Sequence, residues 1–290
     1  MENHSFSRLL PLLFWALLGT SACKTQASFP PDYEATHREW QQERLANLTA
    51  PHGWFSLVGL HWLKPGTNTC GSGTDQDILL APEVPAHACT YYWNEGRVSA
   101  DVNTSAGVQL MDAAEQRMAY RSVQWHLIER GGKWGVRVQD TLMPSRIRLR
   151  AIDTYPLNPS FRITAHWLPA TATDSVKMRN VLDMAYNVPV EGRIRFRFEG
   201  SEYELTALDG GPDDLFLIFS DETTGDTSYG GGRYLYCPRA DKDGTIVVDF
   251  NRAINPPCAF TPFATCLLPT TDNHLPLHIL AGEKVYGEQH

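Results

Sequence analysis

The side chains best suited to chemistry gather in one stretch of the chain, from Phe219 to Lys284. This stretch combines acids, an arginine, amides and a tyrosine with many glycines, prolines and cysteines, which supply turns, fixed backbone angles and thiols. The candidate binding residues are Asp221, Tyr229, Arg233, Asp249, Asn251, Asn255 and Glu283. We expect this stretch to bind a small molecule or a protein partner.

Arg233 follows a glycine-rich segment, T-G-D-T-S-Y-G-G-G at residues 224–232. Glycine backbone N–H groups and the Arg233 guanidinium could together hold a carboxylate or phosphate. Alternatively, the glycines shape a wide hairpin or bulge, and Arg233 is buried against Asp221 or Asp249. Glu283 is also expected to meet Arg233 in a buried ion pair. The sequence leaves both interpretations open.

A second motif, D-F-N-R-A-I-N-P-P, covers residues 249–257. Each of its asparagines, Asn251 and Asn255, can bond backbone groups and hold an irregular loop. Rigid loops often carry functional sites, but the same hydrogen bonds can simply close a β fold. Both roles remain open for this loop.

Two cysteines and two histidines follow at C-x7-C-x7-H-x3-H spacing, at Cys258, Cys266, His274 and His278. A disulfide or buried thiols are the favoured interpretation, and the spacing matches no usual zinc site, so no metal is expected. A hydrolase using Cys258 or Asp221 with His274 is the catalytic alternative. No complete hydrolase, metalloprotease or nucleotide-binding motif occurs, and no cofactor is expected.

The N-terminus carries a location signal. Its apolar run, Leu9–Gly19, is too short to span a bilayer but suits a signal peptide, and T-S-A-C follows. Residues 1–22 therefore predict a lipoprotein signal peptide, with lipidation of Cys23 by acyl chains such as palmitate, and residues 23–31 predict a tether. Ordinary secretion is the alternative. The expected location is the bacterial cell envelope, with membrane contact through the lipid anchor only.

Export makes disulfides possible. Five cysteines remain after Cys23, and the predicted pairs are Cys70 with Cys89 and Cys258 with Cys266, which leaves Cys237 unpaired. The net charge of −8 argues against nonspecific nucleic-acid binding, which needs an excess of Lys and Arg. The expected partner is a small molecule or an envelope protein, and not nucleic acid.

The remaining pattern predicts a mostly β fold, an antiparallel sandwich or barrel with one N-terminal amphipathic helix. The helix is expected at residues 32–49, where Tyr33, His37, Trp40, Arg44 and Leu48 form one stripe suited to docking on a sheet. Short β-rich runs then alternate with turns. A proline-containing connector at 151–160 separates a helix plus first β unit, 32–150, from a second β unit, 151–290, which carries the candidate loops.

Two resemblances stand out. G-W-F-S-L-V-G-L-H-W-L at 53–63, G-G-R-Y-L at 231–235 and the motif through 249–266 resemble an uncharacterised bacterial and archaeal family, domain of unknown function 1684. That family implies no activity. Residues 66–98 resemble more weakly a forkhead-associated β-sandwich, but Ser72 and Pro85 stand where its phosphate-contacting Arg and Ser belong. This second resemblance implies sandwich geometry without phosphopeptide binding.

Together these features predict a cell-envelope lipoprotein that binds a small molecule or partner through the 219–284 loops. The alternatives are the hydrolase and a purely structural envelope protein.

Overall fold

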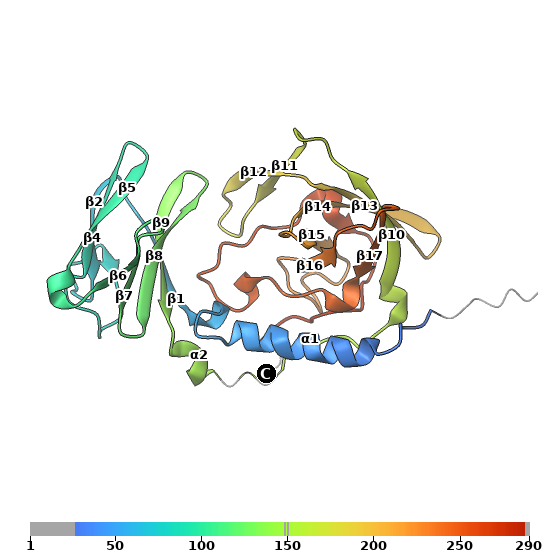
Figure 1. Cartoon of the computed structure of the whole chain (residues 1–290), viewed down its shortest axis with the longest axis horizontal. Coiled ribbons are helices and arrows are strands. Elements are labelled where there is room, and N and C mark those ends of the chain that lie inside the picture. Colours follow the sequence, from blue (N-terminus) through green and yellow to red (C-terminus); the bar gives the residue numbers. More distant parts are fainter. Residues whose placement is uncertain (1–26, 148, 150, 288–290) are drawn as a thin grey trace, which may run out of the picture.

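The structure is a computed structural model that describes residues 27–147, 149 and 151–287. The predicted signal peptide, Cys23 and the first part of the tether lie outside the described residues. Two β units follow one another along the chain, and a long helix lies beside the second unit (Figure 1).

The first unit is a β-sandwich of two sheets whose facing sides enclose one apolar core. One sheet has the order β1-β9-β8-β7-β6 and the other β3-β2-β4-β5. Buried Tyr91, Met118, Trp125 and Val136 join the two sheets in this core. The strands are β1 (Leu57–Trp62), β2 (Gly66–Gly71), β3 (Ile78–Leu79), β4 (Cys89–Asn94), β5 (Arg97–Val102), β6 (Gln109–Asp112), β7 (Arg117–Tyr120), β8 (Val123–Arg130) and β9 (Lys133–Asp140).

The second unit is a nearly closed barrel with the strand order β16-β15-β14-β13-β10-β17. Strict alternation, as in G-R-I-R-F-R-F of β13, turns Ile194 and Phe196 inward and the arginines outward. The strands are β10 (Arg162–Pro169), β13 (Gly192–Phe198), β14 (Ser201–Asp209), β15 (Asp214–Asp221), β16 (Arg233–Pro238) and β17 (Thr245–Asp249), with β18 (His274–Leu275) beside β15 and a hairpin of β11 (Ser175–Arg179) and β12 (Ala185–Pro189).

The N-terminal helix α1 (Tyr33–Leu48) packs on the barrel, although the first unit follows it directly in the chain. The Tyr33 hydroxyl donates to Asp249 Oδ2 at 2.6 Å, and His37 Nε2 donates to Asn251 O at 3.0 Å. The shorter helical turns are η1 (Trp54–Ser56), η2 (Thr104–Ala106), α2 (Met143–Arg146), η3 (Pro159–Phe161), η4 (Phe250–Arg252), η5 (Pro257–Ala259) and η6 (Thr271–Asn273).

Arg44 fixes the C-terminal half of α1. Its Nε donates to Glu283 Oε1 at 3.1 Å, and one of its terminal nitrogens donates to Asn255 O at 2.9 Å. Glu283 is buried, and this burial raises its pKa while Arg44 opposes the rise. The predicted partner of Glu283 was Arg233, and that pairing is wrong, because α1 brings a different arginine to the carboxylate.

The predicted fold class is confirmed, since the chain is mostly β with antiparallel sheets and few helices. The predicted helix is also present, and its stripe docks as expected: Tyr33, His37 and Leu48 are buried. Within the residues that the structure describes, no helix is long and apolar enough to cross a membrane.

The predicted disulfides are absent: all five described cysteines are free thiols. Cys70 and Cys89 oppose each other on β2 and β4. Directly opposed residues have Cβ atoms about 4.5–5.5 Å apart, whereas a disulfide needs about 3.8 Å, so a bridge would have to draw the strands together. Cys266 Sγ instead accepts a hydrogen bond from the Cys258 backbone N–H at 3.0 Å.

The docking of α1 predicts a specific energetic coupling. Replacing Arg44 by Met leaves Glu283 buried without a counter-charge, which should destabilise the protein by about 3–5 kcal/mol. The double variant Arg44→Met/Glu283→Gln should lose clearly less, because it removes the unpaired charge as well. Urea unfolding of Arg44→Met, Glu283→Gln and the double variant measures the coupling. Arg38→Met, on the exposed face of α1, is the matched control, and additive losses would contradict the account.

Candidate functional site

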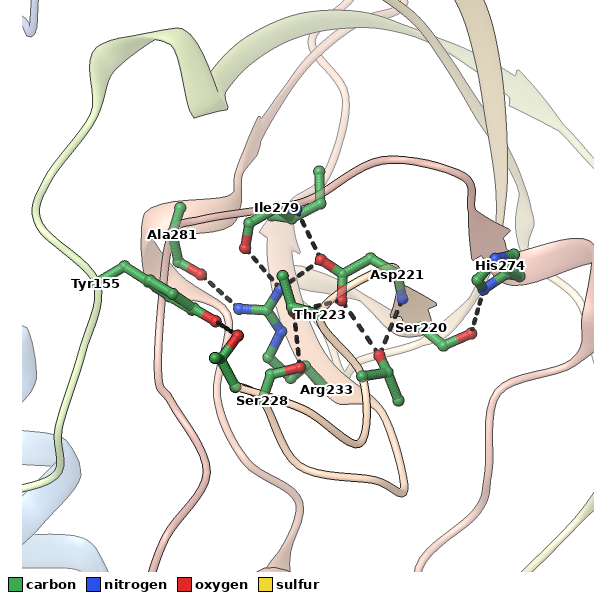
Figure 2. A network of polar contacts seen from close by, with 11 residues as sticks. Tyr155, Ser220, Asp221, Thr223, Ser228, Arg233, His274, Ile279 and Ala281 are labelled. Carbon is green, nitrogen blue, oxygen red and sulfur yellow. Dashed lines mark hydrogen bonds and ion pairs between the residues drawn. The ribbon is translucent and has the colours of Figure 1, made fainter. Parts of the chain in front are cut away.

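The predicted binding residues Asp221 and Arg233 form a closed polar network (Figure 2). Arg233 begins β16 and Asp221 ends the neighbouring strand β15. One terminal nitrogen of Arg233 donates to Asp221 Oδ2 at 3.0 Å and to Ile279 O at 2.9 Å, and the other donates to Ala281 O. Asp221 also accepts hydrogen bonds from the Thr223 hydroxyl and from the Ile279 N–H, each at 2.8 Å.

Neither charged side chain of this network reaches the surface, since both have a side-chain exposure of 0%. The guanidinium lies against the rings of Phe219 and Tyr155. Burial lowers the pKa of Arg233, and the Asp221 carboxylate opposes that shift. These contacts tie β15 and β16 to the segment at 279–281. Arg233 Nε makes no hydrogen bond, but the side chain has no exposed surface through which a ligand could reach it.

Four further predicted residues hold the loop on which α1 docks. Asp249 accepts hydrogen bonds from the backbone and side chain of Asn251, and Asn251 exchanges two hydrogen bonds with the Asn158 backbone. Asn255 N–H donates to Glu283 Oε2 at 2.6 Å, and the Asn255 amide donates to Lys284 O at 2.7 Å. This loop is therefore locked at both ends.

The predicted catalytic pairings do not form. Cys258 interacts with Cys266 and with Tyr229, and these hydrogen bonds lower the pKa of Cys258. His274 Nδ1 instead lies 3.1 Å from Ser220 Oγ, while its Nε2 lies 3.4 Å from Glu222 Oε1. Among the described residues, no group of three or more His, Cys, Asp or Glu side chains could hold a metal ion.

A cleft of about 700 Å³ lies where the first β unit meets the barrel. The sequence did not single it out, because its walls come from parts of the chain that are far apart in sequence. The sandwich contributes Glu129 and Arg130 of β8 and Arg137 of β9, and the outer face of the barrel contributes aromatic side chains. The loop at 254–267 contributes Asn255, Thr265 and Cys266, and Arg44 of α1 and residues 186–189 around β12 complete the lining. Only Asn255 and Cys266 were predicted binding or disulfide residues.

The barrel side of this cleft is an aromatic wall of three residues, Phe216, Tyr234 and Tyr236. The rings of Phe216 and Tyr236 stack at 4.8 Å with an interplanar angle of 22°, and Tyr234 meets Phe216 edge-on. The Tyr234 hydroxyl donates to Leu267 O at 3.0 Å and so anchors the wall to the loop. Tyr236 remains 47% exposed and lines the cleft.

A second hollow of about 520 Å³ lies on the other side of Arg137, lined by His126 with Arg117, Trp54 and His52. His126 opposes Arg137 in the β8–β9 ladder. Burial, followed by the nearby Arg117 and Arg137 guanidiniums, lowers the pKa of His126 from 6.5 to about 4. The imidazole is therefore neutral at neutral pH, beside two cations.

Because Asp221 and Arg233 are fully buried partners, the Asp221→Asn variant should have a lower free energy of unfolding than the wild type. Breaking one partner of a fully buried ion pair costs about 3–5 kcal/mol, so the denaturant midpoint should fall strongly. Asp226→Asn, an exposed acid in the adjacent turn, is the matched control and should change stability little. Unchanged stability in Asp221→Asn would contradict a structural role for this pair.

The lowered pKa of His126 predicts a pH dependence with a definite sign. Between pH 6.5 and about 4 the unfolded chain binds a proton at this imidazole and the folded chain does not, so folding stability falls as pH drops through that window. His126→Gln should lose this part of the slope. Urea unfolding at pH 7 and pH 5 compares the wild type, His126→Gln and the exposed control His52→Gln. A wild-type slope retained in His126→Gln would refute the assignment.

Comparisons with known proteins concern mainly the barrel. None of the curated proteins compared with the chain matches it. One solved structure, an uncharacterised protein from Haloarcula marismortui, is 28% identical; the similarity covers 50% of this chain and 81% of that one, with a TM-score of 0.41. Residues 148–284 match the family described as "Protein of unknown function (DUF1684)". The first predicted resemblance is thus confirmed for the segments at 231–235 and 249–266, which this match includes, while the segment at 53–63 lies outside the matched residues.

Proposed function

We propose that this protein is an exported, lipid-anchored lipoprotein of the bacterial cell envelope that binds a small molecule in the cleft between its two β units. The signal-peptide pattern and Cys23 support the location. The observation that carries the binding proposal is the aromatic wall, in which Tyr236 stacks on Phe216 and presents its ring to the cleft.

The position of the cleft favours ligand binding. Ligand sites occur preferentially where two domains meet, in concave spaces of roughly 300–1,000 Å³ lined by aromatic and apolar side chains with a few polar groups. The cleft has this size and this composition. Part of the expected 219–284 loop system forms its wall, so the proposal keeps the predicted region but moves the contact surface away from Arg233.

The cleft is also built from restrained elements. Asn255 is fixed by Glu283 and Lys284, and Tyr234 is fixed by Leu267. A wall that is already ordered loses little conformational entropy when a ligand binds. The closed networks around Glu283 therefore have a functional consequence, because they hold one side of the cleft in place.

A second candidate function, hydrolysis, draws on one observation. Ser220, His274 and Glu222 form a serine–histidine–carboxylate series, with the hydroxyl and the carboxylate at different ring nitrogens. This series replaces the predicted pairings of Cys258 or Asp221 with His274. The side chains of His274 and Glu222 are 44% and 46% exposed, and neither these two residues nor Ser220 lines the cleft.

A fluorophosphonate probe, which reacts covalently with activated serines, tests hydrolysis. If the protein is a hydrolase, the probe should label Ser220 in the wild type and should not label the variant Ser220→Ala. If the protein only binds its ligand, the probe should label neither protein.

The binding proposal predicts a selective effect of Tyr236→Ala. Small molecules that raise the melting temperature of the wild-type mature chain in a library screen should bind this variant about tenfold more weakly, since an aromatic pair contributes about 0.5–1.5 kcal/mol in addition to the apolar area it buries. Calorimetric titration gives the affinities. Tyr92→Ala, a partly exposed tyrosine on the sandwich, should bind like the wild type. Equal affinity of Tyr236→Ala and the wild type for every such molecule would overturn the proposal.

A further inference from the structure

Among the described residues two arginines are buried, Arg233 and Arg137, and Arg44 is half-buried. Arg233 has Asp221 as its counter-ion, and Arg44 has Glu283. Arg137, which is only 8% exposed, has none: in the described part of the chain no carboxylate forms an ion pair with it or with its neighbour Arg130. An uncompensated charge in such a place is costly unless a partner supplies the opposite charge.

The two guanidiniums converge on a single neutral oxygen. Arg130 Nε donates to Thr265 Oγ1 at 3.1 Å, and a terminal nitrogen of Arg137 donates to the same atom at 3.3 Å. Two like charges thus share one hydroxyl, which has room for only two incoming hydrogen bonds. The Thr265 hydroxyl proton remains free to be donated to a third group beside the two cations.

Arg137 also keeps an unused donor. Its Nε is buried and makes no hydrogen bond, as is also true of Arg233 Nε and Arg252 Nε; Arg137 differs from Arg233 in lacking a counter-ion and in lining a cleft. Buried donors are almost always satisfied in native proteins, so each exception asks for an explanation. An acceptor atom in the cleft would satisfy this N–H and neutralise the charge in one contact.

The surrounding titratable groups do not supply that negative charge. Glu129 also lines the cleft, but its Oε1 accepts a hydrogen bond from the Gly132 N–H in the β8–β9 turn, and in the described part of the chain it forms no ion pair with Arg130 or Arg137. Glu115 is paired with Arg117. His126, across the ladder from Arg137, cannot provide it either, because an imidazole is neutral or positive. Burial and the repulsion from Arg130 lower the pKa of Arg137 to about 10, so it still carries its charge at neutral pH.

Resting on the proposed cleft function, we propose that the ligand carries an oxyanion, a carboxylate or a phosphate, that binds between Arg130 and Arg137 and accepts a hydrogen bond from Thr265. A ring or other planar apolar part of the same molecule then stacks on Tyr236. The planar forks of two arginines match the oxygen geometry of carboxylate and phosphate. The cleft volume of about 700 Å³ has room for both parts.

Four small probes test the proposal on the wild-type mature chain: benzoate, its neutral counterpart benzamide, phenyl phosphate and inorganic phosphate. The readout is an NMR titration that follows the Nε–Hε resonances of Arg130 and Arg137 together with the backbone of residues 254–267. Benzoate or phenyl phosphate should bind at least about tenfold more tightly than benzamide and should shift both arginine resonances.

The results distinguish failure of the oxyanion inference from failure of the proposed ligand binding in the cleft. If benzamide binds in the cleft as tightly as both anions, the anion inference is overturned while cleft binding stands. If no probe shifts any cleft resonance, both the inference and the proposed function fail. Tighter binding of phenyl phosphate than benzoate assigns a phosphate monoester, and the reverse order assigns a carboxylate. If inorganic phosphate binds as tightly as phenyl phosphate, the stacking on Tyr236 is wrong.

Variants give an independent check. Arg130→Gln, at the partly exposed end of β8, should reduce anion affinity to about the level of benzamide. Thr265→Val should weaken anion binding with little effect on benzamide. Arg193→Gln, an exposed arginine paired with Glu204 on the barrel, should leave all four affinities unchanged. Full anion affinity in both Arg130→Gln and Thr265→Val would overturn the proposal.

Discussion

A buried charge needs a counter-charge, and this requirement organises the second unit. Asp221 and Arg233 meet inside the barrel and tie two strands to the segment at 279–281. Glu283 and Arg44 meet at its edge and tie α1 to the loop at 254–267. Each pair recovers its desolvation cost only because further hydrogen bonds surround it. These pairs therefore fix where the chain segments lie more than they add to stability.

The fixed segments explain the shape of the cleft. The loop at 254–267 is held through Asn255 on one side and through the Tyr234–Leu267 hydrogen bond on the other. It presents Thr265 toward the sandwich, where Arg130 and Arg137 reach it. Arg137, the buried arginine without an ion-pair partner among the described residues, thus lies where the two β units and the loop come together. We infer a binding function from this unpaired arginine, because the Asp221–Arg233 and Arg44–Glu283 ion pairs are already explained by their structural role.

Much of the fold could be predicted from the sequence because it depends on local patterns. Alternation in residues 193–199 gives a strand with arginines outside, and the stripe from Tyr33 to Leu48 gives a docking helix. The residue types around Arg233 correctly indicated a polar network, but local patterns do not specify long-range partners. Arg44 and Glu283 are 239 residues apart, so no spacing rule connects them. The cleft was missed for the same reason: Arg137 stands between two valines in a strand, and its lack of a carboxylate becomes visible only in three dimensions.

The central claim is that Arg130 and Arg137 form a site for an oxyanion at the junction of the two units. A crystal structure of the mature chain grown with phenyl phosphate tests it most directly. The account predicts phosphate oxygens about 2.7–2.9 Å from both guanidiniums, with the phenyl ring over Tyr236. An unoccupied cleft at saturating ligand, or phosphate bound elsewhere while Arg137 pairs with a carboxylate of the chain itself, would contradict it.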